Sequence, residues 1–291
     1  MKNQEKPKLT IGMPVHNGES HIFKSLECLA RQTYRNFKVI VFENQSTDNT
    51  LEIIKVFCEK DKRFSVIPSK SFLSALDNFK RAFKHISKDT DFFALRAHDD
   101  YSSDSYMEIL CETLIEHPNK DLSVSSVKFV TSHGNKDALI NASILEDKLW
   151  TTFKRPFSRI QFPASWIYGV YRSNSIDKIF ETLEYYPNAW AGDRLVVLNY
   201  LFDRKLIFAP KAIFRCTLGS DSYSLYSEKS LSSKIKARIR YFQFIWSCRS
   251  RLDINSFYAY SAFFALCFKT SARDTNHTFE TILKSYFRTK K

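Results

Sequence analysis

Three short polar stretches contain the side chains of this sequence whose types and spacing are best suited to chemistry. They read Pro-Val-His-Asn-Gly-Glu at residues 14–19, Glu-Asn-Gln-Ser-Thr-Asp-Asn-Thr at residues 43–50, and Ala-His-Asp-Asp at residues 97–100. Carboxylates, imidazoles and amides of this kind bind polar ligands, and paired carboxylates can also hold a hard cation. The stretches are candidates for a single binding site, provided that the fold brings them together.

Each stretch directly follows a short apolar run, and such runs alternate with segments of helical period. Strands are predicted at Leu9–Pro14, Lys38–Phe42, Phe64–Ile67, Phe92–Leu95 and Leu122–Val130. Between them, the spacing of apolar residues predicts four helices, which contain Leu26, Ile54, Phe79 and Ile109. This alternation is typical of an α/β protein with a mostly parallel, Rossmann-like sheet flanked by helices. Such sheets bind ligands at the carboxyl ends of their strands, so we expect the three polar stretches to meet at one edge.

The second half of the chain is more helical and ends in a strongly basic region. Elements are predicted near Asn174–Leu183 and Asp193–Phe202 (helices), Leu206–Ala209 and Ala212–Cys216 (strands), and throughout residues 229–291 (helices). The net charge is +13, and residues 229–291, with 13 Lys and Arg against three acidic residues, contribute +10 of it. This shift in composition divides the chain into a domain of residues 1–228 and a basic helical region of residues 229–291.

The basic region contains an apolar stripe. Ile235, Ile239, Phe242 and Trp246 recur at helical spacing among Lys and Arg residues, which predicts an amphipathic basic helix. Such a helix could dock on an anionic membrane surface, or pack against the rest of the protein or a partner. Residues 1–7 are polar, and no run approaches the roughly 18 apolar residues that a membrane-spanning helix needs. We therefore expect a cytoplasmic protein that is at most peripheral at the inner face of the membrane.

In order and spacing, the polar stretches and their strands resemble family 2 glycosyltransferases, which have the GT-A fold. The matching segments are IGMPVHNGE, ARQTYRNFKVIVFENQSTDNT and FFALRAHDD, against the family's PxYNxE loop, QTYxNxE(I/V)IVVDDGSTDxT stretch and acidic DxD-type loop. Weaker similarity continues to about residue 220 and includes ALDNFKRA at 75–82, WIYGVYR at 166–172 and Gly192-Asp193-Arg194. The resemblance implies a GT-A domain with a helical C-terminal extension.

The resemblance also implies an activity. It indicates an inverting, hexosyltransferase-type enzyme that moves a sugar from a nucleoside-diphosphate sugar, UDP-linked by default, to a hydroxyl of a glycan or polyprenyl-linked acceptor in surface polysaccharide synthesis. The leaving diphosphate must be neutralised, which a Mg²⁺ or Mn²⁺ ion held by carboxylates can do. By resemblance, the metal ligands are Asp99 and Asp100.

The remaining roles follow from matching positions in the family. The residues implied to bind the donor are Pro14, His16, Glu43, Asn78 and Asp99. Asp193, which precedes the apolar run Leu195–Leu201, is implied to be the catalytic base that takes the proton of the acceptor hydroxyl.

The sequence departs from the family's usual pattern at four positions. His16 stands where the family often has Tyr, and Glu43 where it more often has Asp. Ala97 replaces the first acid of the acidic loop, and Arg215-Cys216-Thr217 stands where the family often has Arg-x-His, whose His can touch metal or diphosphate. The carboxylate set for a metal is therefore smaller than in many relatives.

Three other functions fit parts of the sequence less well. A nucleotidyltransferase that makes nucleotide sugars shares the architecture, but it needs a Gly-rich, basic phosphate loop, which residues 14–19 lack. A dinucleotide-dependent oxidoreductase needs GxGxxG at that place, and the 6 glycines do not provide it. A nucleic-acid-binding protein would account for the basic charge. The apolar stripe of the basic helix instead favours burial or lipid contact, so we expect no nucleic acid partner.

Overall fold

The chain forms two compact units in the computed structural model, which describes residues 5–131, 134–138, 140, 160–217, 229–252 and 254–276. The first unit comprises Met1–Ala138, Ser165–Asp177 and Leu206–Leu218, and the second comprises Leu139–Ala164, Lys178–Lys205 and Gly219–Lys291. The predicted boundary at residue 228 lies outside the described residues, so the division into 1–228 and 229–291 stays a prediction.

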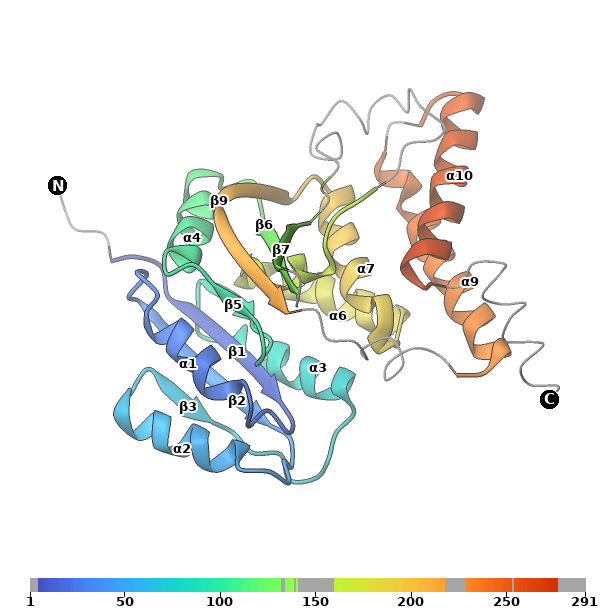
Figure 1. The fold of residues 1–291 in the computed structure, drawn as a ribbon. Coiled ribbons are helices and arrows are strands. Elements are labelled where there is room, and N and C mark those ends of the chain that lie inside the picture. Colours follow the sequence, from blue (N-terminus) through green and yellow to red (C-terminus); the bar gives the residue numbers. More distant parts are fainter. Residues whose placement is uncertain are drawn as a thin grey trace. The chain divides into compact units, whose positions relative to one another are not determined.

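A mixed sheet is the frame of the first unit (Figure 1). Within the described residues its strands are β1 (Leu9–Val15), β2 (Phe37–Glu43), β3 (Phe64–Val66), β4 (Phe92–Leu95), β5 (Tyr101–Ser102), β6 (Leu122–Thr131), β7 (Gly134–Asp137), β8 (Val170–Arg172) and β9 (Leu206–Thr217). Their order across the sheet is β3-β2-β1-β4-β8-β6-β9-β5, and β7 pairs with β6. β3, β2, β1 and β4 are parallel to one another, and β6 is parallel to β9. The predicted α/β fold with a mostly parallel sheet is confirmed.

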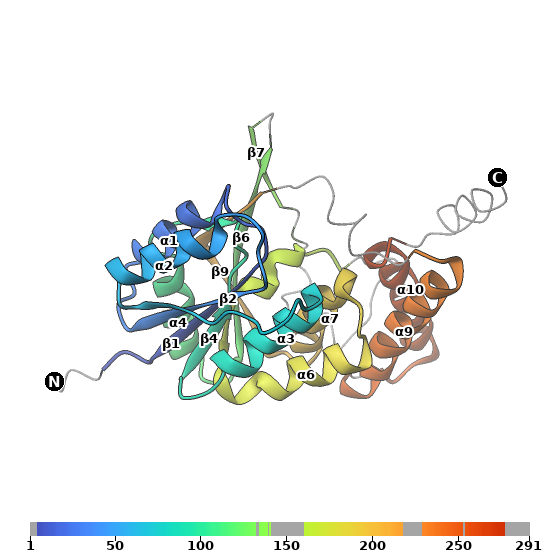
Figure 2. The ribbon, with the colours of Figure 1, turned by 90° about the horizontal axis from the view of Figure 1, so that it is seen from below.

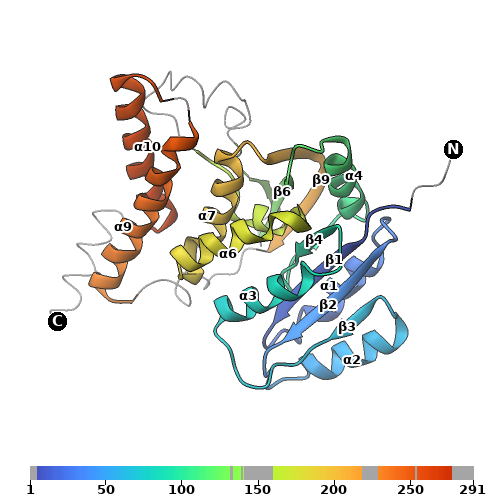
Figure 3. The ribbon, with the colours of Figure 1, turned by 180° about the vertical axis from the view of Figure 1, so that it is seen from behind.

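Helices cover both faces of the parallel strands. α1 (Ile22–Ala30) and α2 (Thr50–Lys60) lie together on one face (Figure 2), and α3 (Ala75–Ile86) lies over β1, β2 and β4 on the other (Figure 3). Crossovers between parallel strands are right-handed. The step from β3 back past β2 and β1 to β4 therefore sends α3 to the face opposite α1 and α2. α4 (Tyr106–Glu116) packs on β6, β8 and β9.

The second unit is helical. It contains α7 (Ala189–Phe202), α9 (Leu231–Ser247) and α10 (Phe257–Asp274), while α6 (Ile176–Tyr185) begins in the first unit and continues into the second. α9 and α10 lie side by side (Figures 1 and 3). Short 3₁₀ turns occupy Ala164–Tyr168, Ser173–Ser175 and Cys248–Arg251. In the described part of the chain, no helix combines the length and the apolar character needed to cross a membrane.

The sheet differs from the sequence-based expectation at β9. The sequence predicted two strands there, but the structure has one strand with a bulge: Ser125 pairs with Ala209, and Ser126 pairs with Ile213. Pro210 lies in the bulge, where its missing amide hydrogen costs no ladder bond. The strands β5, β7 and β8 were not predicted either. β5 and β8 are only two and three residues long, and β7, with the sequence GNKD, contains no apolar residue.

Gly169 directly precedes β8, and replacing it tests how closely β8 and β6 pack. A Cβ atom there would lie 2.3 Å from the carbonyl oxygen of Ser123 in β6. We expect Gly169→Ala to lower the free energy of unfolding by about 2 kcal/mol or more, because backbone must shift to relieve the clash. Urea unfolding followed by circular dichroism measures this. Gly192→Ala is the control, since its Cβ would meet side chains only at 3.5 Å and beyond; equal losses from both variants would contradict the prediction.

Candidate active site

Hydrogen bonds join the loop after β1 to the loop after β2. The amide of Asn17 donates to Ser46 Oγ (3.0 Å), and the amide of Thr47 donates to Asn17 Oδ1 (2.8 Å). The amide of Gly18 donates to Thr50 Oγ1 (2.7 Å) in the first turn of α2. Asn17 has a left-handed backbone conformation (φ 50°), which Asn tolerates better than most residues. The two loops therefore form one polar edge.

The loop after β4 reaches the same edge. A Cβ atom at Gly18 would lie 2.7 Å from the His98 ring, so the glycine makes room for this imidazole. Ser25 Oγ of α1 donates to the carbonyl oxygen of Asp100 (3.3 Å). Burial lowers the pKa of His98, and the nearby Asp99 carboxylate opposes this shift. The three polar stretches thus meet at the carboxyl ends of β1, β2 and β4, as the sequence predicted.

Glu43 lies at the end of β2 and is almost completely buried, with 2% of its surface exposed. Its Oε1 accepts a hydrogen bond from the amide of Ser46, three residues further along the loop. Its Oε2 has no hydrogen-bond partner within the described ranges. Among the described residues, Glu43 therefore bonds the loop with one carboxylate oxygen, while the other makes no hydrogen bond.

Pro14 and His16 lie where β1 ends. Pro14 is still part of the strand, in register with Phe42 of β2. The His16 Nδ1 atom lies 2.9 Å from the carbonyl oxygen of Asn44. Its ring packs edge-on against Phe72, with ring centroids 5.0 Å apart, although Phe72 is 63% exposed. This pair forms a small aromatic surface next to the end of β2.

Two side chains of α3 hold the end of β2 and the segment between β3 and α3. Asn78 Nδ2 donates to the carbonyl oxygen of Phe42 (3.1 Å). Arg81 donates to the carbonyl oxygens of Ile67 (2.7 Å) and Pro68 (3.0 Å). An open hollow of about 360 Å³ is lined by Ile67, Pro68, Ser69, Lys70, Ser71, Leu73 and Arg81. Asn78 thus supports the backbone near this hollow, and its contact with a donor stays a prediction.

The two carboxylates of the acidic loop have different environments. Asp100 is buried, and its Oδ1 accepts a hydrogen bond from the amide of Thr217 (2.8 Å) at the end of β9. Burial, and then the Asp99 carboxylate, raise the pKa of Asp100 to about 7, while the Thr217 amide and Arg96 act in the opposite direction. Asp99 is half-buried, and its carboxylate has no hydrogen-bond or ion-pair partner among the residues described. Asp99 is therefore the carboxylate that can meet a ligand.

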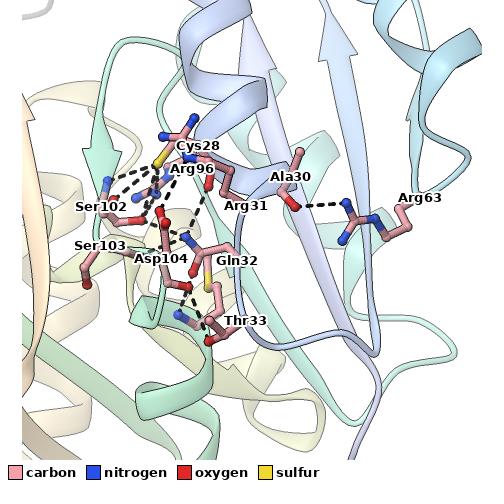
Figure 4. Close-up of polar contacts among 11 residues, drawn as sticks. Cys28, Ala30, Arg31, Gln32, Thr33, Arg63, Arg96, Ser102, Ser103 and Asp104 are labelled. Carbon is pink, nitrogen blue, oxygen red and sulfur yellow. Dashed lines mark hydrogen bonds and ion pairs between the residues drawn. The ribbon is translucent and has the colours of Figure 1, made fainter.

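Arg96, which directly precedes the acidic loop, is fully buried. Figure 4 shows its guanidinium beside Cys28 and Ser102. Its guanidinium donates to Ser102 Oγ and lies over the rings of Tyr106 (5.4 Å) and Phe214 (4.9 Å). Within the described parts of the chain no carboxylate pairs with it, and its Nε and Nη1 have no hydrogen-bond partner. Cys28 Sγ accepts a bond from the Ser102 amide (3.3 Å) in the same cluster. The two aromatic faces, the bond to Ser102 and the attraction of the Asp100 carboxylate therefore stabilise this buried cation together.

The acidic loop fits a divalent cation only if a ligand completes the coordination. Across the described ranges, no group of three or more His, Cys, Asp or Glu side chains is arranged to hold a metal ion. Mg²⁺ is commonly held by one or two carboxylates together with substrate phosphates, and the unpaired Asp99 carboxylate suits that arrangement. Asp100 suits it less, because the Thr217 amide already bonds one of its oxygens.

Asp193 lies in the second unit, near the start of α7. The helix is interrupted at Trp190 and Ala191, and Ala191 has a left-handed conformation (φ 67°) that is uncommon for alanine. Asp193 Oδ1 accepts a hydrogen bond from the amide of Arg194 (2.7 Å). Burial raises the pKa of Asp193, an effect that Arg194 opposes and Asp274 reinforces. The role of Asp193 as catalytic base stays a prediction.

This mixed sheet, with acidic and imidazole side chains in the loops at the carboxyl ends of its parallel strands, has the GT-A fold of solved glycosyltransferases. Among solved structures, TarS 1-349 of S. aureus in complex with UDP-GlcNAc is similar with a TM-score of 0.64 and 16% identity, covering 94% of this chain and 77% of that chain. The mannosyltransferase PcManGT of Pyrobaculum calidifontis in complex with GDP-Man and Mn²⁺ gives a TM-score of 0.54 and 14% identity, covering 93% and 74%. These similarities concern the fold.

Residues 10–179 match the model of glycosyl transferase family 2, and this chain belongs to that family. It is 26% identical over 245 residues to glycosyltransferase GlyA of Streptococcus pneumoniae serotype 4, covering 79% of this chain and 33% of GlyA. It is 25% identical over 141 residues to the putative glycosyltransferase EpsE of Bacillus subtilis, covering 48% and 50%. The chain thus spans about a third of the length of GlyA and half of EpsE.

Two polar side chains that organise the site, Arg81 and Gln32, were not predicted from the sequence. Arg81 bonds the carbonyl oxygens of Ile67 and Pro68 in the segment between β3 and α3. Gln32, at the end of α1, accepts from the Met107 amide (2.9 Å) and donates to the carbonyl oxygen of Ser103 (3.0 Å), which fixes α4 behind the acidic loop (Figure 4). Both residues lie in segments that resemble the family, and that similarity was the available signal.

The raised pKa of Asp100 predicts a pH-dependent stability. Asp100 ionises near its ordinary value of 3.8 when unfolded but only near 7 when folded. Its contribution to stability is therefore complete below pH 3.8 and is lost as the pH rises to 7. Asp100→Asn does not titrate. From pH 5.5 to pH 8, we expect the free energy of unfolding of the wild type to fall relative to this variant by about 2 kcal/mol.

Urea unfolding of both proteins at the two pH values, with a chelator present, measures this difference. Asp89→Asn, at an exposed position, is the control. If the gap between wild type and Asp100→Asn is the same at both pH values, the environment described for Asp100 is wrong.

Proposed function

We propose that this chain is an inverting hexosyltransferase that moves a sugar from a nucleoside-diphosphate sugar to a hydroxyl of a glycan or polyprenyl-linked acceptor in surface polysaccharide synthesis. The observation that carries the proposal is the meeting of three strand-end loops, on which Glu43 and Asp99 have carboxylate oxygens without a hydrogen-bond partner among the described residues. Membership of glycosyltransferase family 2 supports sugar transfer as the reaction. The reaction would take place at the cytoplasmic side of the membrane.

The nucleoside of the donor binds next to the end of β2 in this proposal. The unpaired oxygen of Glu43 accepts a hydrogen bond from a base N–H or a ribose hydroxyl, and the His16–Phe72 pair offers an aromatic surface to the base. Pro14, in register with Phe42, and Asn78, which donates to the carbonyl oxygen of Phe42, position the ends of the strands that carry these groups. Uridine is favoured as the base because the structurally similar TarS binds UDP-GlcNAc.

The diphosphate then lies toward the acidic loop. A bound Mg²⁺ or Mn²⁺ ion supplies neutralisation of the charge that develops on the leaving diphosphate. Asp99 would hold this ion through its unpaired carboxylate, with Asp100 as a second ligand. Because Asp100 also bonds the Thr217 amide, it keeps the acidic loop attached to the end of β9.

Asp193 takes the proton of the acceptor hydroxyl as that oxygen attacks the anomeric carbon from the face opposite the leaving group. Two local features support this role. Burial raises the pKa of Asp193, which brings a carboxylate closer to the range in which a base works best. The left-handed Ala191 lies two residues before it, and strained backbone of this kind concentrates at functional sites.

Loss of the Asp99 carboxylate should weaken metal-dependent donor binding. We expect Asp99→Asn to reduce the affinity for UDP-sugars in Mn²⁺ by about tenfold or more, because a neutral amide is a poorer ligand for a hard cation. Calorimetric titration with and without a chelator measures this, and Asp89→Asn is the exposed control. Equal wild-type affinity with and without the chelator would contradict the role of Asp99. Failure of every nucleotide sugar to bind would count against the proposed function itself.

Removal of the catalytic base should affect turnover and spare donor binding. We expect Asp193→Asn to lower kcat by about 10²- to 10⁴-fold, the range for loss of general-base catalysis, with little change in the donor dissociation constant. Asp177→Asn, at an exposed position in α6, is the matched control. Nuclear magnetic resonance of the product reports whether the anomeric configuration is inverted. Unchanged turnover in Asp193→Asn would rule out this residue as the base.

A further inference from the structure

α9 and α10 of the second unit form an antiparallel pair held by aromatic side chains. Trp246 packs edge-on against Tyr260 (ring centroids 5.2 Å apart), and Phe242 against Phe264 (5.3 Å). One turn nearer the start of α9, the Arg238 guanidinium lies 4.6 Å from the centre of the Phe268 ring. These contacts use residues that recur every four positions on each helix, so the seam runs along most of both helices.

Large apolar side chains remain exposed along this seam. The aromatic stripe, as we call it, consists of Phe257 (90% exposed), Tyr260 (43%), Phe264 (51%) and Phe268 (54%) on α10, and Ile235 (40%) and Ile239 (49%) on α9. The α10 members are spaced 3, 4 and 4 residues apart and therefore lie on one side of that helix. Exposed apolar side chains gathered in this way mark an interaction surface, whereas scattered ones do not.

The helices that carry the aromatic stripe are strongly basic. Residues 229–252 and 254–276 contain nine Lys and Arg and one carboxylate, Asp274. Asp274 is buried, where it accepts bonds from Tyr241 (2.6 Å) and Arg273 (2.7 Å). Lys236, Arg240 and other cations are exposed. In these described ranges no exposed carboxylate offsets the positive charge of the surface.

We propose that the aromatic stripe and its flanking cations dock on the surface of an anionic lipid bilayer. Helices that lie in the interface bury an apolar, aromatic face at the boundary of headgroups and acyl chains, and place Lys and Arg among the headgroups. Each basic side chain near an anionic membrane adds attraction. The combination in α9 and α10 of an exposed apolar stripe with exposed cations such as Lys236 and Arg240 fits this kind of partner.

Two other partners fit the surface less well. A second copy of this chain bound through the same face would bring like charges together, which opposes association. Single-stranded nucleic acid would match the charge and could stack on the aromatic rings, but the aliphatic Ile235 and Ile239 offer nothing to base stacking. They do gain from contact with acyl chains. This inference goes beyond the proposed sugar transfer and does not depend on it.

The test is co-sedimentation of the full chain with vesicles, in the absence of donor and acceptor. One set of vesicles mixes phosphatidylglycerol with phosphatidylcholine, and the other contains phosphatidylcholine alone. We expect the chain to bind the anionic vesicles, with an affinity that falls as the salt concentration rises. Its affinity for the neutral vesicles should be lower by about tenfold or more. Equal binding to both vesicle types, or to neither, would overturn the proposal.

Paired variants assign the binding to this surface. Phe257→Ser with Phe264→Ser, and separately Lys236→Gln with Arg240→Gln, should each weaken anionic vesicle binding by about tenfold or more. The matched controls, Val56→Ser with Ile115→Ser and Lys55→Gln with Lys60→Gln, change exposed side chains of α2 and α4 and should leave it unaltered. Circular dichroism verifies that every variant is folded.

Several results would overturn the proposal. One is an equal loss of binding in the variants and their controls. A second is a dimer that the aromatic variants, but not Val56→Ser with Ile115→Ser, convert to monomer in light scattering. A third is binding of a single-stranded oligonucleotide that the Lys236 and Arg240 variants abolish while vesicle binding persists.

Discussion

The hydrogen bonds between the loops that follow β1 and β2 are the interaction on which the candidate site depends. Parallel pairing sets Val15 opposite Glu43, so both strands end at the same edge of the sheet. The reciprocal bonds of Asn17 with Ser46 and Thr47 then hold the two loops together. Without these bonds and the others between the same loops, from the Gly18 amide to Thr50 and between the His16 ring and the Asn44 carbonyl oxygen, Glu43 and His16 would lie on turns that are not joined. A ligand would then have to order both loops itself, at a cost in binding energy.

Buried polar groups support this edge from behind. Arg96 and Asp100 are both removed from water, and each is stabilised by contacts from distant segments: the rings of Tyr106 and Phe214 for the cation, and the Thr217 amide for the carboxylate. Burial of charged groups is costly unless it is compensated. The two acids of the loop therefore differ in role. Asp100 attaches the loop to the end of β9, and the Asp99 carboxylate has no partner among the described residues.

The second unit contains the residues on which the proposed catalytic base and the proposed docking surface rest. Its α7 carries a carboxylate with a raised pKa beside a left-handed alanine. Its α9 and α10 bury one carboxylate and expose aromatic and basic side chains. If the acceptor is attached to a lipid, a surface that binds anionic lipid would concentrate the enzyme where that acceptor is found. The two proposals rest on different residues, so each can be tested without the other.

Much of this protein was determined by local sequence pattern. Alternating strands and helices predicted the parallel half of the sheet, and the polar stretches after those strands predicted the edge that the loops of His16, Glu43 and Asp99 share, because right-handed crossovers leave few other arrangements. Tertiary structure alone decided the short strands β5 and β8, the bulge at Pro210, the bond from Thr217 to Asp100 and the burial of Arg96. The bond to Asp100 spans 117 positions of the chain. Periodicity reports only on neighbours within a few residues, so contacts between segments this far apart, and the pKa values that they set, appear only when the chain is folded.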